Sequence, residues 1–136
     1  QIGSLGITFL KSRHETQGQA DIFEMTVPPH TNLHVPHLHR AYDETIIGIN
    51  GTTTWTLDGQ KHQVGPGQQL HIPRGVVHTY VNTYRTTARM LCILTPGLVG
   101  PEYFRELAAT VDESGKPDIV AVAAIMARYG VTPAKA

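Results

Sequence analysis

The sequence contains a single cysteine, Cys92, among its 136 residues, so it can form neither an internal disulfide nor a cysteine-based zinc cluster. Any bound metal must therefore be held by histidine and carboxylate side chains. The sequence also lacks an excess of charge, since 11 Lys and Arg balance 11 Asp and Glu, which argues against nucleic acid as a partner. No apolar run approaches the roughly 18 residues that cross a bilayer, and the N-terminus lacks a signal-peptide pattern. We therefore expect a cytoplasmic protein without a membrane partner.

Turn signals divide most of the chain into short segments, which predicts an all-β fold in one domain. Asn50-Gly51 and Asp58-Gly59 are dipeptides that supply the positive φ angles of tight type I′ hairpins, and the segment between them is rich in β-branched residues. So many short antiparallel strands must close into a barrel or sandwich to hide their edges. Strands are expected at residues 5–10, 21–27, 33–39, 44–49, 52–57, 61–64, 69–72, 77–82 and 87–94.

After Thr95 the pattern changes from period two to a helical period, which predicts two short C-terminal helices. Pro101 suits the first turn of one helix, on which Phe104 and Leu107 share a face. A second helix is expected over residues 117–129, ending at Gly130. We therefore expect a β-barrel over residues 1–98 and a helical extension over 99–136, packed on the same domain and covering an opening or outer face of the barrel.

Three histidines and one glutamate are spaced as the ligands of one transition metal. His37 and His39 alternate with Leu38, so on a strand both imidazoles point to the same face. Glu44 follows His39 by five residues, so the chain must reverse through residues 40–43 to return its side chain on the neighbouring strand. His78 would arrive from a third strand. Nitrogen and oxygen ligands suit one divalent ion, and they do not distinguish Fe, Mn, Ni, Zn and Cu.

Two motifs in the chain resemble those of single-domain cupins. The first family motif, G-x5-H-x-H-x3,4-E-x6-G, matches from His37 to Gly51, although Thr31 stands where its first glycine would fall. The second motif, G-x5-P-x-G-x2-H-x3-N, is complete from Gly67 to Asn82. The resemblance covers about residues 30–96 and implies a cupin-type antiparallel jelly-roll barrel. It also implies that the metal ligands are His37, His39, Glu44 and His78.

Strand parity and the motif turns give candidate positions around this centre. The pocket-lining candidates are Tyr42, Ile46, Trp55, Tyr80, Met90 and Cys92. Tyr42 could place its hydroxyl near the metal or lie on the surface, and parity leaves open which face of the Trp55 and Met90 strands is inside. His30 and His34 lie near the site in sequence, with His34 expected to face outward. His71 could line the barrel mouth or lie on the surface. Asn82 suits a supporting or packing role better than ligation.

The metal centre favours an enzyme acting on a small molecule, with Glu44 as the catalytic residue moving between ligand and general base. The resemblance to quercetin-dioxygenase-like bacterial cupins, echoed by the C-terminal helices, implies a dioxygenase-like reaction on an enol or phenol. The alternatives are an isomerase or lyase acting on a sugar or small carbonyl compound, and a non-catalytic cupin that binds a small ligand. Family likeness also implies a homodimer paired through residues 2–10, a stretch that could equally be an internal edge strand.

Overall fold

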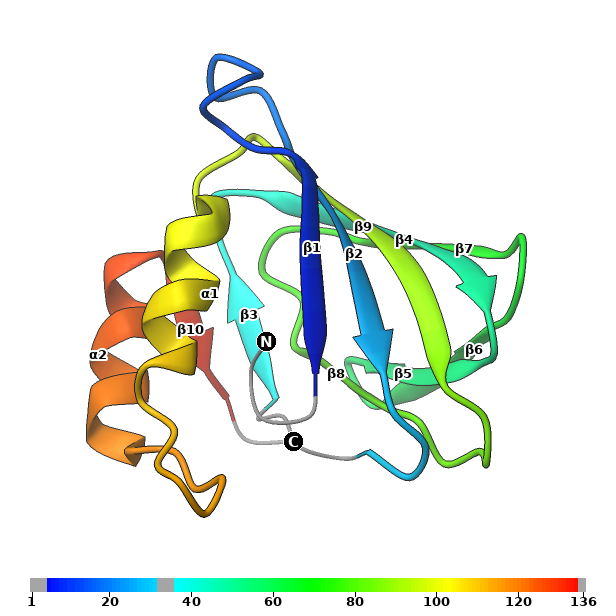
Figure 1. The fold of residues 1–136 in the computed structure, drawn as a ribbon. Helices are drawn as coiled ribbons and strands as arrows, with labels where there is room; N and C mark the ends of the chain where they lie inside the picture. Colours follow the sequence, from blue (N-terminus) through cyan, green and yellow to red (C-terminus); the bar gives the residue numbers. More distant parts are fainter. Residues whose placement is uncertain (1–4, 32–35, 135–136) are drawn as a thin grey trace.

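The computed structural model describes residues 5–31 and 36–134, and these form two antiparallel sheets that face each other across a common core (Figure 1). The first sheet has the order β1 (Gly6–Lys11), β2 (Asp21–Val27), β9 (Ala88–Thr95), β4 (Asp43–Asn50) and β7 (Gln69–Ile72). The second has the order β10 (Val131–Pro133), β3 (His37–His39), β8 (His78–Val81), β5 (Thr53–Leu57) and β6 (Gln60–Val64). The predicted all-β fold is confirmed.

The core lies between the sheets because the strands alternate in polarity. On β2, Phe23, Met25 and Val27 are buried while the residues between them are half-buried. The neighbouring strand β9 buries its alternate residues in the same way, and Phe23 lies opposite Cys92 in the register. Burial of one face of each sheet supplies the main stabilisation of such a fold, at about 25 cal/mol per Å² of apolar surface.

The two predicted hairpin dipeptides behave differently. Asp58 and Gly59 both have positive φ, at 46° and 83°, and they join the paired strands β5 and β6 as expected for a type I′ turn. The hairpin expected at Asn50-Gly51 is wrong, because β4 and β5 belong to different sheets. Only Gly51 has positive φ there, at 68°, and a side chain at this position would lie 2.7 Å from the Thr87 carbonyl oxygen. The dipeptide therefore carries the chain from one sheet to the other.

Two helices, α1 (Gly100–Ala108) and α2 (Ile119–Arg128), lie together beside β1, β3 and β10 (Figure 1). The buried Asp21 carboxylate accepts hydrogen bonds from the backbone N–H groups of Val99 and Gly100, at 3.1 and 3.0 Å, and so holds the start of α1. Phe104 packs against the stacked rings of Phe9 and Phe23. The two helices therefore lie against one side of the β core.

The chain adds one strand that the sequence analysis does not predict. After α2, β10 pairs with β3, and Val131 lies opposite His39 in the register. The strand is only three residues long and ends in Pro133, so it carries no alternating pattern of its own. Its effect is to cover the edge of the strand that carries two of the candidate ligands.

At the N-terminus, β1 pairs with β2 of the same chain, so residues 6–11 form an edge strand of the first sheet. The homodimer stays a prediction. Residues 32–35, which include His34 and the first part of the strand expected at 33–39, lie outside the described residues. Neither of the described helices has the length and apolar character needed to cross a membrane.

Candidate metal centre and its cavity

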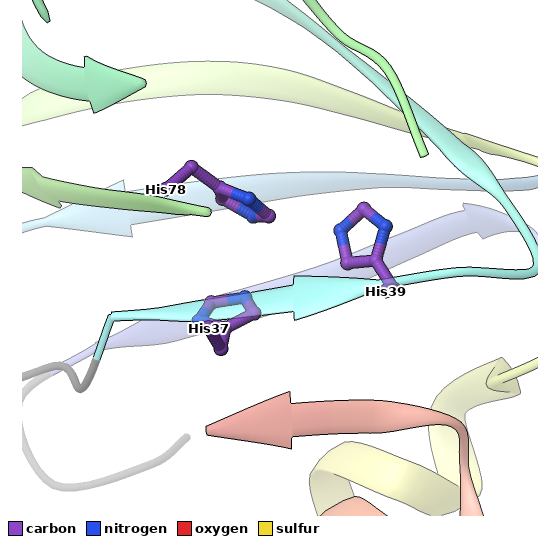
Figure 2. A group of neighbouring side chains, drawn as sticks. All are labelled: His37, His39 and His78. Carbon is purple, nitrogen blue, oxygen red and sulfur yellow. The ribbon is translucent and has the colours of Figure 1, made fainter. Parts of the chain in front are cut away.

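Three histidines converge between the sheets (Figure 2). His37 and His39 lie on β3, and His78 lies on β8 directly opposite His37 in the register. One nitrogen from each of the three imidazoles lies within 4.8 Å of the other two. The Gly75 N–H donates to the His39 carbonyl at 2.9 Å, so the turn of the second motif is tied to the strand of the first. Strand pairing thus brings together ligands that are about 40 residues apart in sequence.

Backbone carbonyl groups orient two of the three rings. The Nδ1 atom of His39 lies 2.9 Å from the Tyr42 carbonyl oxygen, and Nδ1 of His78 lies 2.9 Å from that of Val76. In the tautomer that donates these bonds, the Nε2 atom keeps its lone pair. The Nε2 of His78 is buried and makes no hydrogen bond to any described residue. A buried nitrogen with a free lone pair suits a metal cation, and second bonds of this kind are typical of metal-binding histidines.

Glu44 lies next to two of the histidines. Its Oε1 atom is 3.1 Å from Nε2 of His39 and 3.5 Å from Nε2 of His78. Burial alone would raise the pKa of Glu44, but the two imidazoles outweigh it and hold this pKa well below its ordinary range. The carboxylate is therefore ionised and directed at the nitrogens that would bind a metal.

The path of the chain to Glu44 differs from the expected one. The sequence predicts that Glu44 returns on the strand next to β3, but β4 belongs to the opposite sheet. Residues 40–42 carry the chain across the barrel, and Glu44 faces the histidines from the other side. The Asp43 carboxylate accepts a hydrogen bond from the Arg74 backbone N–H at 3.1 Å. This bond connects the end of the crossing segment to the second motif. The four predicted ligands are thus brought together from three strands and both sheets.

A cavity of about 320 Å³ opens beside the histidines. Its wall is mainly apolar and aromatic, which is typical of small-molecule sites. The Tyr42 ring stacks on His39, with centroids 4.1 Å apart, and the Trp55 ring lies 6.4 Å from that of His78. Besides the four candidate ligands, the described residues that line it are Leu5, Ile7, Phe23, Met25, Tyr42, Trp55, Tyr80, Leu94, Val99, Tyr103, Phe104, Leu107, Thr110, Val111, Gly115, Pro117, Val122, Met126 and Val131.

The structure places the predicted pocket residues in two groups. Tyr42, Trp55 and Tyr80 line the cavity. Ile46, Met90 and Cys92 do not line it, although all three are buried, with at most 1% of their surface exposed. Ile46 lies opposite Cys92 in the β4–β9 register, so these side chains fill the barrel interior further along the strands from the Glu44 end. Parity identifies an inward face, but it does not say how far along a strand the interior is hollow.

The other singled-out polar residues lie away from the centre. His30 and His71 are exposed, and Nδ1 of His71 lies 3.3 Å from the Thr45 hydroxyl. Asn82 is fully buried and donates to the carbonyl groups of Val27, Pro28 and Thr86, so it joins two loops. Thr31, at the place of the missing motif glycine, is buried and its hydroxyl donates to the Pro28 carbonyl at 2.7 Å.

Sequence reasoning missed most of the outer wall of the cavity. Most of the missed residues come from β1 and β2, from α1 and α2, and from the loop that joins the helices, and β9 and β10 each add one. The alternation of Phe23 and Met25 on β2 was a usable signal, as was the shared helical face of Phe104 and Leu107. The role of Tyr103 could not be predicted from sequence, because the pattern of its helix does not show which part of the barrel the helix packs against.

Comparison with known proteins agrees with the fold and the motifs. The family model described as Cupin domain matches residues 23–94. The chain is 34% identical over 97 residues to quercetin 2,3-dioxygenase of Bacillus subtilis, an alignment that covers 71% of this chain but only 28% of that protein. The structure of a predicted oxalate decarboxylase from Thermotoga maritima matches at a TM-score of 0.64 and 19% identity, covering 68% of this chain and 80% of that one. A cupin-superfamily sugar phosphate isomerase from Silicibacter pomeroyi matches at 0.54 and 19%, covering 72% and 75%. These structural likenesses show the fold alone.

Proposed function

Because the chain belongs to the cupin domain family, we propose that it is a metal-dependent enzyme acting on a small molecule, with an oxidative, dioxygenase-like reaction on an enol or phenol favoured. The observation that carries the proposal is the buried Nε2 of His78, which makes no hydrogen bond to any described residue and lies at the inner end of an apolar cavity. The sequence likeness to quercetin 2,3-dioxygenase supports the oxidative reaction. The chain spans about a quarter of that protein, so its activity enters here as part of the proposal.

His37, His39, His78 and Glu44 would hold the metal. Such a metal, when bound, would polarise a substrate oxygen or bring an oxidisable substrate together with O₂. The chain itself supplies the ionised Glu44 carboxylate, which lines the cavity and in this proposal is the base for a substrate hydroxyl. The aromatic wall would pack against the apolar part of the substrate.

The first test is the metal content of protein purified without chelators. We expect about one transition-metal ion per chain. His37→Ala combined with His78→Ala should lose it, because two of the four ligands are gone. His62→Ala, which changes an exposed histidine on β6, should keep it. Stoichiometric metal in the double variant would rule out the four-ligand site.

The second test is oxygen uptake by the metal-loaded protein with a panel of enols, flavonols and diketones. Uptake that depends on one class of substrate supports the oxidative reaction. Conversion of a sugar or small carbonyl compound without oxygen uptake would replace it with the isomerase or lyase alternative. Tight binding of a ligand without turnover by any loaded metal would identify a binding protein instead.

A further inference from the structure

The outer wall of the cavity is built by the part of the chain that follows the family-matched segment. Tyr103 and Leu107 come from α1, Val122 and Met126 come from α2, and all four line the cavity. The matched segment ends at residue 94, so these side chains lie outside the part of the chain that the family model describes. The residues that line this outer end of the cavity are therefore candidates for determining substrate specificity.

Two of the tyrosines that line this cavity have hydroxyl groups without a hydrogen-bond partner among the described residues. Tyr42 and Tyr103 are both buried, and neither hydroxyl makes a hydrogen bond to a described residue. Tyr80 differs from them, since its hydroxyl donates to the Met25 sulfur at 3.0 Å. Buried tyrosines usually place their hydroxyl on a hydrogen-bond partner. Burial raises the pKa of Tyr103, and the nearby Glu44 charge adds to this, so its phenol keeps a proton to donate.

No lysine or arginine is among the described residues that line the cavity. Glu44 is the only carboxylate among these described lining residues. Apart from Thr110, whose hydroxyl donates to the Leu107 carbonyl, the remaining wall away from the histidines is apolar or aromatic. A phosphate or carboxylate group placed against that wall would lose its hydration without gaining a cationic partner, which is costly in free energy. The cavity volume of about 320 Å³ lies at the small end of the usual range for ligand sites.

We propose that the cavity binds a neutral, mainly apolar small molecule, and that the Tyr103 hydroxyl selects it by donating a hydrogen bond to its hydroxyl or carbonyl oxygen. Tyr42 offers a second contact nearer the histidines. This inference rests on the proposed function for the location of the site, and it deepens that function by naming the substrate class. It excludes sugar phosphates and small dicarboxylates as the ligands of this chain.

The test measures binding to the metal-free protein by equilibrium dialysis, with 2-naphthol, naphthalene and 2-naphthyl phosphate as probes. We expect 2-naphthol to bind more tightly than naphthalene, and 2-naphthyl phosphate to bind at least tenfold more weakly than 2-naphthol. Tyr103→Phe should weaken 2-naphthol binding by about five- to tenfold, the effect of one neutral hydrogen bond, and leave naphthalene unchanged. Tyr84→Phe is the matched control, since its hydroxyl lies on the surface and accepts a bond from Gln63.

A purely packing role for Tyr103 would weaken both naphthalene and 2-naphthol equally, and that result would overturn the hydrogen bond. Equal affinity for 2-naphthyl phosphate would overturn the neutral substrate class. Leu107→Trp, which fills the cavity, should reduce binding of both neutral probes, and unchanged binding in this variant would place the ligand elsewhere. The measurement needs neither metal nor turnover. Its result therefore still tests the neutral ligand class if the protein proves to bind no metal.

Discussion

At the scale of single residues, the centre depends on how each imidazole is turned. The carbonyl groups of Tyr42 and Val76 hold Nδ1 of His39 and His78, and this directs both Nε2 atoms toward the Glu44 carboxylate. Glu44 forms a hydrogen bond with Nε2 of His39, whereas Nε2 of His78 lies 3.5 Å from the same carboxylate oxygen and makes no hydrogen bond to a described residue. The imidazole nitrogens and the carboxylate oxygen that lie close together are therefore the atoms that would bind a metal.

Glu44→Gln tests the role of the carboxylate charge while keeping the shape of the side chain. We expect metal affinity to fall by at least about tenfold, because even partners outside the ligand set commonly cost 10- to 100-fold. Turnover should be lost, since an amide cannot accept the substrate proton. Metal titration followed by dye competition measures the affinity, and wild-type affinity in Glu44→Gln would remove Glu44 from the ligand set.

At the scale of elements, local turn chemistry and strand pairing decided which predictions succeeded. Asp58-Gly59 forms the predicted hairpin between β5 and β6, with the mostly exposed β6 at the edge of the sheet, whereas Asn50-Gly51 links two sheets. A dipeptide fixes backbone angles and not the partner of the strand that follows it. For the same reason, the reversal before Glu44 was predictable, but the sheet that receives Glu44 was not.

The contact between α1 and α2 has a predictable pH dependence. The Glu106 carboxylate accepts from the Tyr129 hydroxyl and pairs with Arg128, and these contacts lower the pKa of Glu106. A lowered folded-state pKa adds stability above the ordinary Glu value of about 4.3, and this stability is lost as the pH falls through the folded-state pKa. We expect Glu106→Gln to lower Tm slightly at pH 7, with the difference from wild type shrinking below about pH 4.

Glu113→Gln is the control for this measurement, because Glu113 is exposed in the loop between the helices and makes no ion pair with the described residues. Thermal unfolding followed by circular dichroism at several pH values compares the three proteins. A difference between Glu106→Gln and wild type that stayed constant down to pH 3 would show that the ionised carboxylate does not act through these contacts.

At the scale of the whole molecule, the barrel and its ligand motifs could be predicted because the sequence patterns that indicate them are local. Alternation, the turn dipeptides and each of the two ligand motifs, one with His37 and His39 and the other with His78, lie within short segments. The cavity was harder to predict, since its wall includes residues of β1, β2 and both helices. The sequence of one segment does not show where another segment packs against it. Ile46 and Tyr80 show the limit clearly: both point inward, but only Tyr80 lies where the interior is hollow.

Metal binding should stabilise the whole fold, because the ligands come from three strands and both sheets. A ligand that binds only the folded state stabilises it by about 2.7 kcal/mol at 100 times its Kd. For a chain of this size, that stabilisation corresponds to a Tm increase on the order of 10 °C. We expect Tm to rise with added Fe²⁺, Mn²⁺, Ni²⁺ or Zn²⁺ and to fall on removal with a chelator, while Mg²⁺, which prefers oxygen ligands, should have little effect. The variant carrying His37→Ala and His78→Ala separates this site from non-specific binding: its Tm should not respond to metal, and a response equal to that of the wild type would place the stabilising ion elsewhere.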